Sequence, residues 1–183
     1  MIKNAVHPKD YPQDDRPEVA IVGRSNSGKS SLINSLLGSD DSFVSKRPGK
    51  TRLINFFDKG ENYRIVDMPG YGFAARALDE INQWTTMIET YFSLRSNLVG
   101  MAMTLDIRRD WTDDEVMLLR LSQSLGKEFA LVLTKADKLS LNDKNKRMAY
   151  FKRKKIDNIF MVSNLNLDGI KEFESFIFNE WIK

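Results

Sequence analysis

The residues best suited to chemistry lie in one short polar stretch between two apolar segments. Gly23, Gly28, Lys29 and Ser30 have the spacing G-x-x-x-x-G-K-S, which is the pattern of a phosphate-binding loop. Glycines let backbone N–H groups converge on a phosphate, and a helix that follows adds the positive end of its dipole. The lysine of such a loop reaches the β- and γ-phosphates, and the serine hydroxyl binds Mg²⁺. The stretch therefore predicts a nucleotide site.

The segments on either side of this loop have the character that such a loop needs. Val19 to Val22 form an apolar run that predicts a buried strand, and helical spacing resumes after the loop at Leu32, Ile33, Leu36 and Leu37. Strand, loop and helix in this order are the context of the motif. The alternative is a flexible turn that matches by accident, which at ordinary glycine usage should occur roughly once in a hundred chains of this length.

The composition excludes several classes of protein. The 183 residues are 42% hydrophobic and 29% charged, with no cysteine and a single histidine, His7. Disulfide frameworks, thiol chemistry and Cys/His metal sites are therefore excluded, and a reducing compartment is favoured. Leu98 to Leu105 is too short an apolar stretch to cross a bilayer, and the N-terminus lacks the pattern of a signal peptide. We expect a cytoplasmic protein without membrane contact.

The order of the segments predicts the fold. Residues 1–17 hold three prolines and are expected to form an extended lead-in, and residues 18–183 are expected to form one domain. Strands alternate with helices, which favours a three-layer α/β fold with helices on both faces of a mostly parallel, six-stranded sheet. One hairpin supplies an antiparallel edge strand. Expected strands are 19–22, 53–57, 63–66, 98–106, 128–134 and 158–162. Expected helices begin near residues 31, 81, 113, 142 and 170, and Thr112-Asp-Asp-Glu115 fits a capping box at the start of the third.

Two further segments follow where a bound nucleotide would need them. Asp67-Met-Pro-Gly70 ends an apolar strand, so Asp67 can reach the Mg²⁺ shell through water and the Gly70 N–H can meet a γ-phosphate. The alternative is an ordinary Pro-Gly turn. Thr51, in the long polar loop 39–52, could give its hydroxyl to Mg²⁺ and its N–H to the γ-phosphate, although any threonine in a polar loop would fit that description.

The fourth segment predicts which base is bound. Thr134-Lys135-Ala136-Asp137 follows the second buried strand, at the edge of the sheet where open α/β folds bind ligands. A carboxylate at Asp137 would accept hydrogen bonds from N1–H and the 2-amino group of guanine, which adenine lacks, and Lys135 could cover the base. The alternative is a strand-end turn with exposed charges. The order and spacing of all four segments together favour guanine.

These strings carry a resemblance to a known family. Residues 16–31, 48–57, 67–73 and 133–139 resemble the motifs of small P-loop GTPases with a Ras-like G domain, and specifically those of the EngB family of bacterial ribosome-biogenesis GTPases. The resemblance extends from about Arg16 to Trp181. The fifth nucleotide motif of the family usually reads Ser-Ser or Ser-Ala, whereas Ser163-Asn164 stands here. Because that motif contacts the guanine oxygen largely through backbone N–H groups, we expect Asn164 to keep the geometry.

The resemblance implies a function and a set of site residues. It implies a GTPase that converts GTP to GDP and phosphate with Mg²⁺ and is needed to assemble the large (50S) ribosomal subunit. Its partners would be the rRNA and proteins of the subunit precursor, bound by a monomer. Lys29, Thr51 and Gly70 would be catalytic, and Ser30, Thr51 and, through water, Asp67 would hold the metal. The implied nucleotide-binding residues are Gly23, Arg24, Ser25, Asn26, Ser27, Gly28, Lys29, Ser30, Ser31, Thr51, Asp67, Gly70, Thr134, Lys135, Asp137, Ser163 and Asn164.

One position predicts slow intrinsic hydrolysis. Ras-like GTPases orient the attacking water with a glutamine directly after the Asp-x-x-Gly string, but this chain has Tyr71 there. The missing group would come from the ribosome, or from K⁺ held near Asn26, which stands where potassium-stimulated relatives carry a cation-binding asparagine.

Basic charge is concentrated in one segment. Residues 135–155 hold nine Lys or Arg against two Asp, whereas the whole chain carries only +3. Tyr150 and Phe151 are interleaved with these charges, which suits RNA phosphates and a stacking platform. The alternative is a solvated helix face with Phe151 packed inward; the family resemblance favours RNA.

Two other functions remain open from the sequence. One is a P-loop ATPase or small-molecule kinase, against which the Thr-Lys-Ala-Asp string argues. The other is a ribosome-binding module that holds GTP with negligible turnover. For a working switch, we expect GTP to order the loop 39–52 and the segment 69–77 and hydrolysis to release them.

Overall fold

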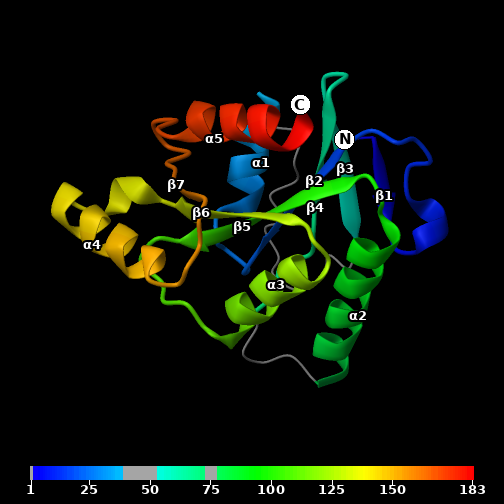
Figure 1. Cartoon of the computed structure of the whole chain (residues 1–183), viewed down its shortest axis with the longest axis horizontal. Helices are drawn as coiled ribbons and strands as arrows, with labels where there is room; N and C mark the ends of the chain where they lie inside the picture. Colours follow the sequence, from blue (N-terminus) through cyan, green and yellow to red (C-terminus); the bar gives the residue numbers. More distant parts are fainter. Residues whose placement is uncertain (1, 39–52, 73–77) are drawn as a thin grey trace.

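The computed structural model describes residues 2–38, 53–72 and 78–183 (Figure 1). Thr51 and the rest of the loop 39–52 lie outside the described residues, and so do residues 73–77 of the second expected switch segment. The predictions made for them therefore remain predictions.

A twisted sheet forms the centre of the molecule, with strand order β1-β3-β4-β2-β5-β6-β7 (Figure 1). Strand β3 runs antiparallel to both of its neighbours, and the other adjacent pairs are parallel. The expected α/β class with a mostly parallel sheet is thus confirmed. The strands are β1 (Lys3–Ala5), β2 (Glu18–Gly23), β3 (Ile54–Lys59), β4 (Tyr63–Asp67), β5 (Leu98–Asp106), β6 (Glu128–Thr134) and β7 (Ile159–Met161).

The sheet has seven strands rather than the expected six, because the lead-in contributes β1. Its three residues pair with β3, with Ala5 opposite Ile54. This pairing satisfies backbone groups of β3 that would otherwise lack a partner within the sheet. Three residues are too few to show the alternation that reveals a strand in a sequence, so β1 was not predicted.

Helices cover both faces of the sheet, as expected (Figure 1). One face packs against α1 (Lys29–Leu37), α5 (Ile170–Phe176) and the π-helical turn η3 (Ile177–Ile182), and the other packs against α2 (Leu78–Leu94), α3 (Asp113–Ser124) and α4 (Leu141–Lys152). Side chains of β2 alternate between these layers: Val19 and Ile21 face α1, whereas Ala20 and Val22 face the other side. Because helices bury both faces of the sheet, every residue in this part of β2 is apolar and the strand reads as a continuous apolar run.

One contact fixes the start of a helix, and another fixes how η3 packs on the sheet. At the start of α3, the Thr112 N–H donates to Oε2 of Glu115 at 2.8 Å, which confirms the predicted capping box. On the other face, the ring of Trp181 in η3 covers Gly100 of β5, where a Cβ would lie 2.8 Å from a ring carbon. Only glycine at position 100 allows Trp181 to pack this closely.

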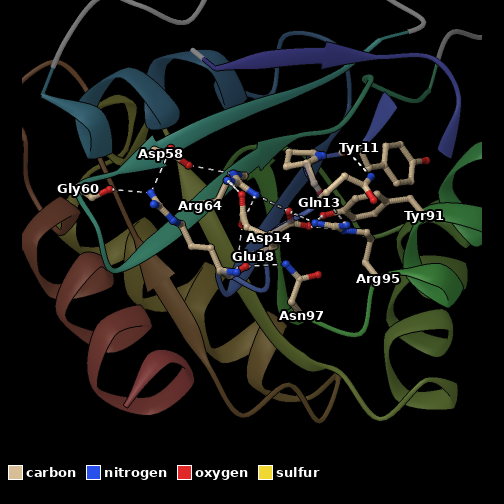
Figure 2. A network of polar contacts seen from close by, with 12 residues as sticks. Tyr11, Gln13, Asp14, Glu18, Asp58, Gly60, Arg64, Tyr91, Arg95 and Asn97 are labelled. Carbon is tan, nitrogen blue, oxygen red and sulfur yellow. Dashed lines mark hydrogen bonds and ion pairs between the residues drawn. The ribbon is translucent and has the colours of Figure 1, made fainter. Parts of the chain in front are cut away.

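A buried charge network closes the end of the sheet opposite the phosphate-binding loop (Figure 2). The Glu18 carboxylate is fully buried and accepts from Arg64 at 3.1 Å, from Arg95 at 2.5 Å and from the Tyr91 hydroxyl at 2.7 Å. Arg64 also pairs with Asp14 of the lead-in at 2.9 Å. Because buried charges are stable only when paired, this network ties the lead-in to β2, β4 and the end of α2.

Among the described helices, none is both long and apolar enough to span a membrane.

Candidate nucleotide-binding site

The loop between β2 and α1 has the backbone that phosphate binding requires. Gly28 has φ +87°, and a Cβ there would lie 3.2 Å from the side chain of Thr134. At Gly23, a Cβ would lie 2.5 Å from Ser27 Oγ. Asn26, at the tip of the loop, has φ 63°. Close packing therefore requires glycine at both positions, and the positive φ adds a second reason at Gly28.

Two threonines hold this loop against the central strands. Thr104 Oγ1 in β5 lies 2.7 Å from Ser27 Oγ and donates to the Val22 carbonyl at 3.1 Å, and the Thr134 hydroxyl donates to the carbonyl of Ser27. Ser27 is buried, so its side chain supports the loop from behind. The sequence reasoning missed Thr104; the available signal was a hydroxyl inside an otherwise apolar strand.

The loop lysine lies beside the carboxylate predicted for the metal shell. Lys29 Nζ forms an ion pair with Asp67 Oδ1, and Asn55 donates to the other oxygen of Asp67 at 3.3 Å. The first residue of α1 and the last residue of β4 thus meet, in a contact that the sequence did not predict. Asn55 is a further residue of this cluster that the sequence reasoning did not single out.

These groups fit a nucleotide with a magnesium ion. The Lys29 ammonium, the loop amides and the N-terminus of α1 are donors for phosphate, while the Ser30 hydroxyl and the Asp67 carboxylate are oxygen ligands of the kind that Mg²⁺ prefers. The described residues contain no cluster of three or more His, Cys, Asp or Glu side chains that could hold a metal. Few protein ligands suit Mg²⁺, which usually completes its shell with phosphate oxygens and water.

The Asp67–Gly70 string lies directly against the loop. The Tyr71 N–H donates to the Gly23 carbonyl at 3.2 Å, and the Ser25 N–H donates to the Tyr71 carbonyl at 3.1 Å. A Cβ at Gly70 would lie 3.3 Å from the Ser25 nitrogen. The predicted γ-phosphate contact, Gly70, therefore belongs to the same cluster as the loop.

The side chain of Tyr71 turns away from the loop into the protein. It is only 4% exposed, its hydroxyl donates to Glu115 Oε1 at 2.9 Å, and its ring packs 5.6 Å from that of Trp84. Burial, followed by the charge of Glu115, raises the pKa of Tyr71 far above its ordinary value. Tyr71 is thus a neutral donor with a partner, unsuited to activating water.

The predicted guanine segment lies at the end of β6. Ser163 Oγ donates to Asp137 Oδ1 at 2.8 Å, and Lys138 lies 3.2 Å from Oδ2. The hydrogen bond from Ser163 is the first cause of a pKa of Asp137 below its ordinary value. The carboxylate is therefore ionised at neutral pH, as acceptance of two donors from guanine requires.

Lys135 joins the guanine segment to the phosphate-binding loop. Its ammonium donates to the Asn26 carbonyl at 2.9 Å and lies 3.1 Å from Asp106 Oδ2. Asp106 also accepts two hydrogen bonds from the Arg108 guanidinium, and these bonds, followed by the contact with Lys135, hold the pKa of Asp106 well below its usual range against the opposing effect of burial. Asp106 and Arg108 were not singled out from the sequence, since a charged pair after a strand is common.

Ser163-Asn164, which departs from the usual fifth motif, has hydrogen-bond partners for both residues. Ser163 is buried, and its N–H donates to the Asp168 carbonyl at 3.0 Å. The side chain of Asn164 accepts from Ser35 Oγ of α1 at 3.1 Å. The Asn164 side chain thus faces α1, which leaves any contact with guanine to the backbone.

Arg24 was predicted to bind the nucleotide, but its side chain contacts the start of α3. Its guanidinium donates to Glu115 and Asp114 at 2.8 Å and to the Thr112 hydroxyl at 2.6 Å. Arg24 can therefore contact a nucleotide only through its main chain in this arrangement. Ser31 is exposed on the first turn of α1.

The expected stacking platform is wrong for Phe151. Helix α4 places Phe151 on its inner face, where it is fully buried, and Tyr150 is partly buried beside it. Arg147 lies 4.9 Å from both rings and holds the neighbouring loop through Asp110 at 2.8 Å and the Ile107 carbonyl at 2.7 Å. The exposed basic residues at and just after the end of α4 are Lys152, Arg153, Lys154 and Lys155.

Comparison with known proteins agrees with this site. Residues 18–135 match a family described as "50S ribosome-binding GTPase". A protein of Bdellovibrio bacteriovorus named "Probable GTP-binding protein EngB" is 48% identical over 100% of this chain and 92% of its own length. A protein of the same name from Pelobacter propionicus is 48% identical over 81% of this chain and 75% of its own length.

Solved structures give the same result. A crystal structure of a probable GTP-binding protein engB superimposes with a TM-score of 0.69 at 25% identity, covering 88% of this chain and 96% of the other. Aquifex aeolicus Era, at 22% identity and a TM-score of 0.71 over 91% of this chain and 56% of its own, shares the fold. The chain therefore belongs to the EngB family of GTP-binding proteins.

Proposed function

We propose that this protein is a GTP-hydrolysing switch that acts in assembly of the large ribosomal subunit in the bacterial cytoplasm. The observation that carries the proposal is the convergence of Lys29, Asp67, Gly70 and Lys135 on one phosphate-binding loop, with Asp137 two residues beyond Lys135. The matching family's description, which names 50S ribosome binding, supports the choice of partner.

Nucleotide binding would rearrange the ion pair between Lys29 and Asp67 in particular. Lys29 is paired with Asp67, so its ammonium exchanges that carboxylate for the phosphates, and Asp67 becomes available to water in the metal shell. Mg²⁺, when bound, neutralises charge on the β- and γ-phosphates. The ionised Asp137 selects guanine over adenine, and Lys135, anchored to the loop at Asn26, lies at the base.

Hydrolysis would be slow without a partner. The Tyr71 hydroxyl donates its proton to Glu115, and the side chain has no amide group to orient water. The missing group would be supplied by the ribosomal particle or by K⁺ near Asn26, whose side chain is exposed at the tip of the loop. Comparison of turnover in K⁺ and Na⁺, in the wild type and in Asn26→Ala, tests the cation: equal rates in all four reactions remove it.

The partner would be recognised in part by phosphate contacts. Lys152 to Lys155 place four adjacent cationic side chains in solvent at the end of α4, and such a cluster binds RNA in a strongly salt-dependent way. Charge reversal at Lys152 and Lys154 should weaken particle binding and flatten its salt dependence in both nucleotide states. A matched reversal at Lys171, exposed on α5, should leave particle binding close to that of the wild type.

Two measurements distinguish this proposal from the alternatives. Competition between GTP and ATP decides against a P-loop ATPase or kinase if ATP fails to displace GTP. Single-turnover hydrolysis with and without large-subunit precursors separates a switch from a module with negligible turnover, because only a switch accelerates when particles are present.

The deciding experiment is co-sedimentation with large-subunit precursors in GDP and in a non-hydrolysable GTP analogue. We expect tighter binding with the GTP analogue, since the ordered switch segments would complete the surface that the particle binds. Asp137→Asn supplies the control: its particle binding should respond to xanthosine nucleotides and no longer to guanosine nucleotides. Equal particle affinity in GDP and the GTP analogue would contradict the proposed coupling.

A further inference from the structure

One buried carboxylate joins three parts of the site. Glu115 lies in the first turn of α3 and is fully buried. Its Oε1 accepts from Arg24 at 2.8 Å and from the Tyr71 hydroxyl at 2.9 Å, and its Oε2 accepts from the Thr112 N–H at 2.8 Å. Arg24 belongs to the phosphate-binding loop and Tyr71 follows the Asp67–Gly70 string, so Glu115 connects both segments to α3.

The two residues that Glu115 holds are also paired through their backbones. Tyr71 forms hydrogen bonds with Gly23 and Ser25, the neighbours of Arg24, at 3.2 and 3.1 Å. The Arg24 guanidinium lies 5.8 Å from the centre of the Tyr71 ring. A shift of the Tyr71 side chain would therefore move a backbone segment that is packed against the loop.

The residues on either side of Tyr71 fit this contact closely. Gly72 has φ +80°, and a Cβ there would lie 3.0 Å from Cγ of Arg24. Gly70, before Tyr71, has almost as little room beside Ser25. Trp84 of α2 donates from its indole nitrogen to the Pro69 carbonyl at 2.8 Å. The string that presents Gly70 is thus fixed at Tyr71 and at Pro69.

We propose that Glu115 is a positioning residue for GTP hydrolysis: by holding Arg24 and Tyr71 together, it sets how the Gly70 N–H is presented at the phosphate-binding loop. Glu115 touches neither the loop amides nor Asp137, and it acts only through Arg24 and Tyr71. The inference rests on the proposed GTPase function. It adds a role for α3 and for the tyrosine that replaces the glutamine of Ras-like proteins.

The test is Glu115→Gln, which keeps the shape of the side chain but replaces one acceptor oxygen with an NH₂ group. That group must face either Arg24 and Tyr71 or the Thr112 N–H, all of which donate to Glu115. We expect the single-turnover rate of GTP hydrolysis to fall roughly tenfold to a hundredfold, the scale of a small misplacement at a reacting centre. Affinity for GDP should stay within about threefold of the wild type, because the loop and Asp137 are intact. A loss confined to the rate is a result that general destabilisation would not give.

Two further variants sharpen the comparison. Asp114→Asn is the matched control, since Asp114 also pairs with Arg24 at 2.8 Å but is half exposed and is not bonded to Tyr71; it should hydrolyse GTP at the wild-type rate. Tyr71→Phe removes only the hydroxyl and should reproduce much of the Glu115→Gln effect. The double variant should be no slower than the slower single variant, because both changes break the same contact.

Trp84 supplies a readout that does not depend on turnover. In a Trp111→Phe, Trp181→Phe background, Trp84 is the remaining tryptophan, and its contact with Pro69 reports the position of the Asp67–Gly70 string. Binding of a non-hydrolysable GTP analogue should change Trp84 fluorescence in the wild type and change it less in Glu115→Gln.

A Glu115→Gln protein with the wild-type rate, an unaltered Trp84 response, or equal losses of rate and GDP affinity would overturn the proposal. A wild type without GTP turnover, even with ribosomal particles, would overturn the proposed function instead, and the Trp84 response would still test Glu115.

Discussion

The hydroxyl of Ser163 donates a hydrogen bond of 2.8 Å to Oδ1 of Asp137, across 26 positions of sequence. The two residues follow different strands, β7 and β6, and meet because both strands end at the same edge of the sheet. The bond orients the Asp137 carboxylate and favours its ionised form. The fifth motif therefore supports the fourth through a side chain, in addition to any backbone contact with the base.

Asp137→Asn should exchange guanine for xanthine specificity. The amide no longer accepts both donors of guanine, and each lost hydrogen bond to a charged group costs about 1.5–3 kcal/mol, so affinity for GTP should fall at least about a hundredfold. Xanthosine triphosphate should bind instead. Equilibrium titration with labelled nucleotides measures both, and Ser163→Ala, which leaves the carboxylate in place, should cost far less. Unchanged GTP affinity in Asp137→Asn would remove Asp137 from the site.

Asp67→Asn should uncouple magnesium from nucleotide binding. Residues that act on a metal through its shell typically change metal affinity by 10- to 100-fold, so the gain in GTP affinity on adding Mg²⁺ should shrink by about that factor. In EDTA, affinity should hold or rise, because Lys29 is released from its ion pair with Asp67. Titrations with Mg²⁺ and with EDTA give the comparison. Asn55→Ala, which removes only the weaker 3.3 Å contact, serves as the control.

Gly100→Ala should destabilise the fold without touching the site. The added methyl would lie 2.8 Å from the Trp181 ring, and overpacking of this kind costs about 1–3 kcal/mol. Urea unfolding in the wild type and in a Trp181→Leu background measures the free energy of unfolding. The cost of Gly100→Ala should largely disappear in the Trp181→Leu background, where the smaller side chain leaves room for the methyl; an equal cost in both backgrounds would mean that the ring is not the obstacle.

Stability should decline steeply above about pH 10. Burial, followed by the negative charge of Glu18, raises the pKa of Tyr91 well above its ordinary 10.0, and burial also raises the pKa of Tyr63 and Tyr71. Above pH 10 the unfolded chain releases these protons while the folded chain retains them, so each such tyrosine removes about 1.4 kcal/mol of stability per pH unit. Below pH 10 both states hold the protons and this contribution is constant.

Tyr91→Phe isolates one of these tyrosines. The variant should lose about 1 kcal/mol at neutral pH, because the bond to Glu18 is gone, yet its stability should fall less steeply with pH above 10. Urea titrations at a series of alkaline pH values, with tyrosinate absorbance as a second signal, measure the slope. An unchanged slope would show that Tyr91 ionises equally easily in the folded and unfolded chain.

The sequence was informative where one residue type carries a single physical meaning. The glycines of the loop, the lysine after them and the continuous apolar strands led to the correct fold class and to the position of the phosphate-binding loop between a strand and a helix. The capping box at Thr112 was equally specific, because it joins two residues three positions apart. These signals are local, and the structure adds little to them.

The parts of the fold and of the site that were not predicted depend on the direction in which a side chain points. Periodicity alone does not determine that direction. Arg24 stands among binding residues but reaches α3, Phe151 stands among basic residues but is buried, and Glu115 looked like an ordinary helix-capping residue. In each case the partner comes from a distant segment that the sheet brings near. The short β1 lacked any signal, since its pairing is determined by what β3 leaves uncovered.

Strand β1 also covers a sheet edge that could otherwise pair with a neighbouring molecule. The outer edge of β3, which holds Phe56 and Phe57, is covered over Ile54 to Phe56 by a strand of only three residues that begins with a lysine. Short, charged edge strands are poor templates for pairing with another chain. A protein that lacks residues 1–6 would expose the six residues of β3 as an open edge and would self-associate through it. We therefore expect the N-terminal strand to protect this edge from aggregation, in addition to burying Ala5 in the core.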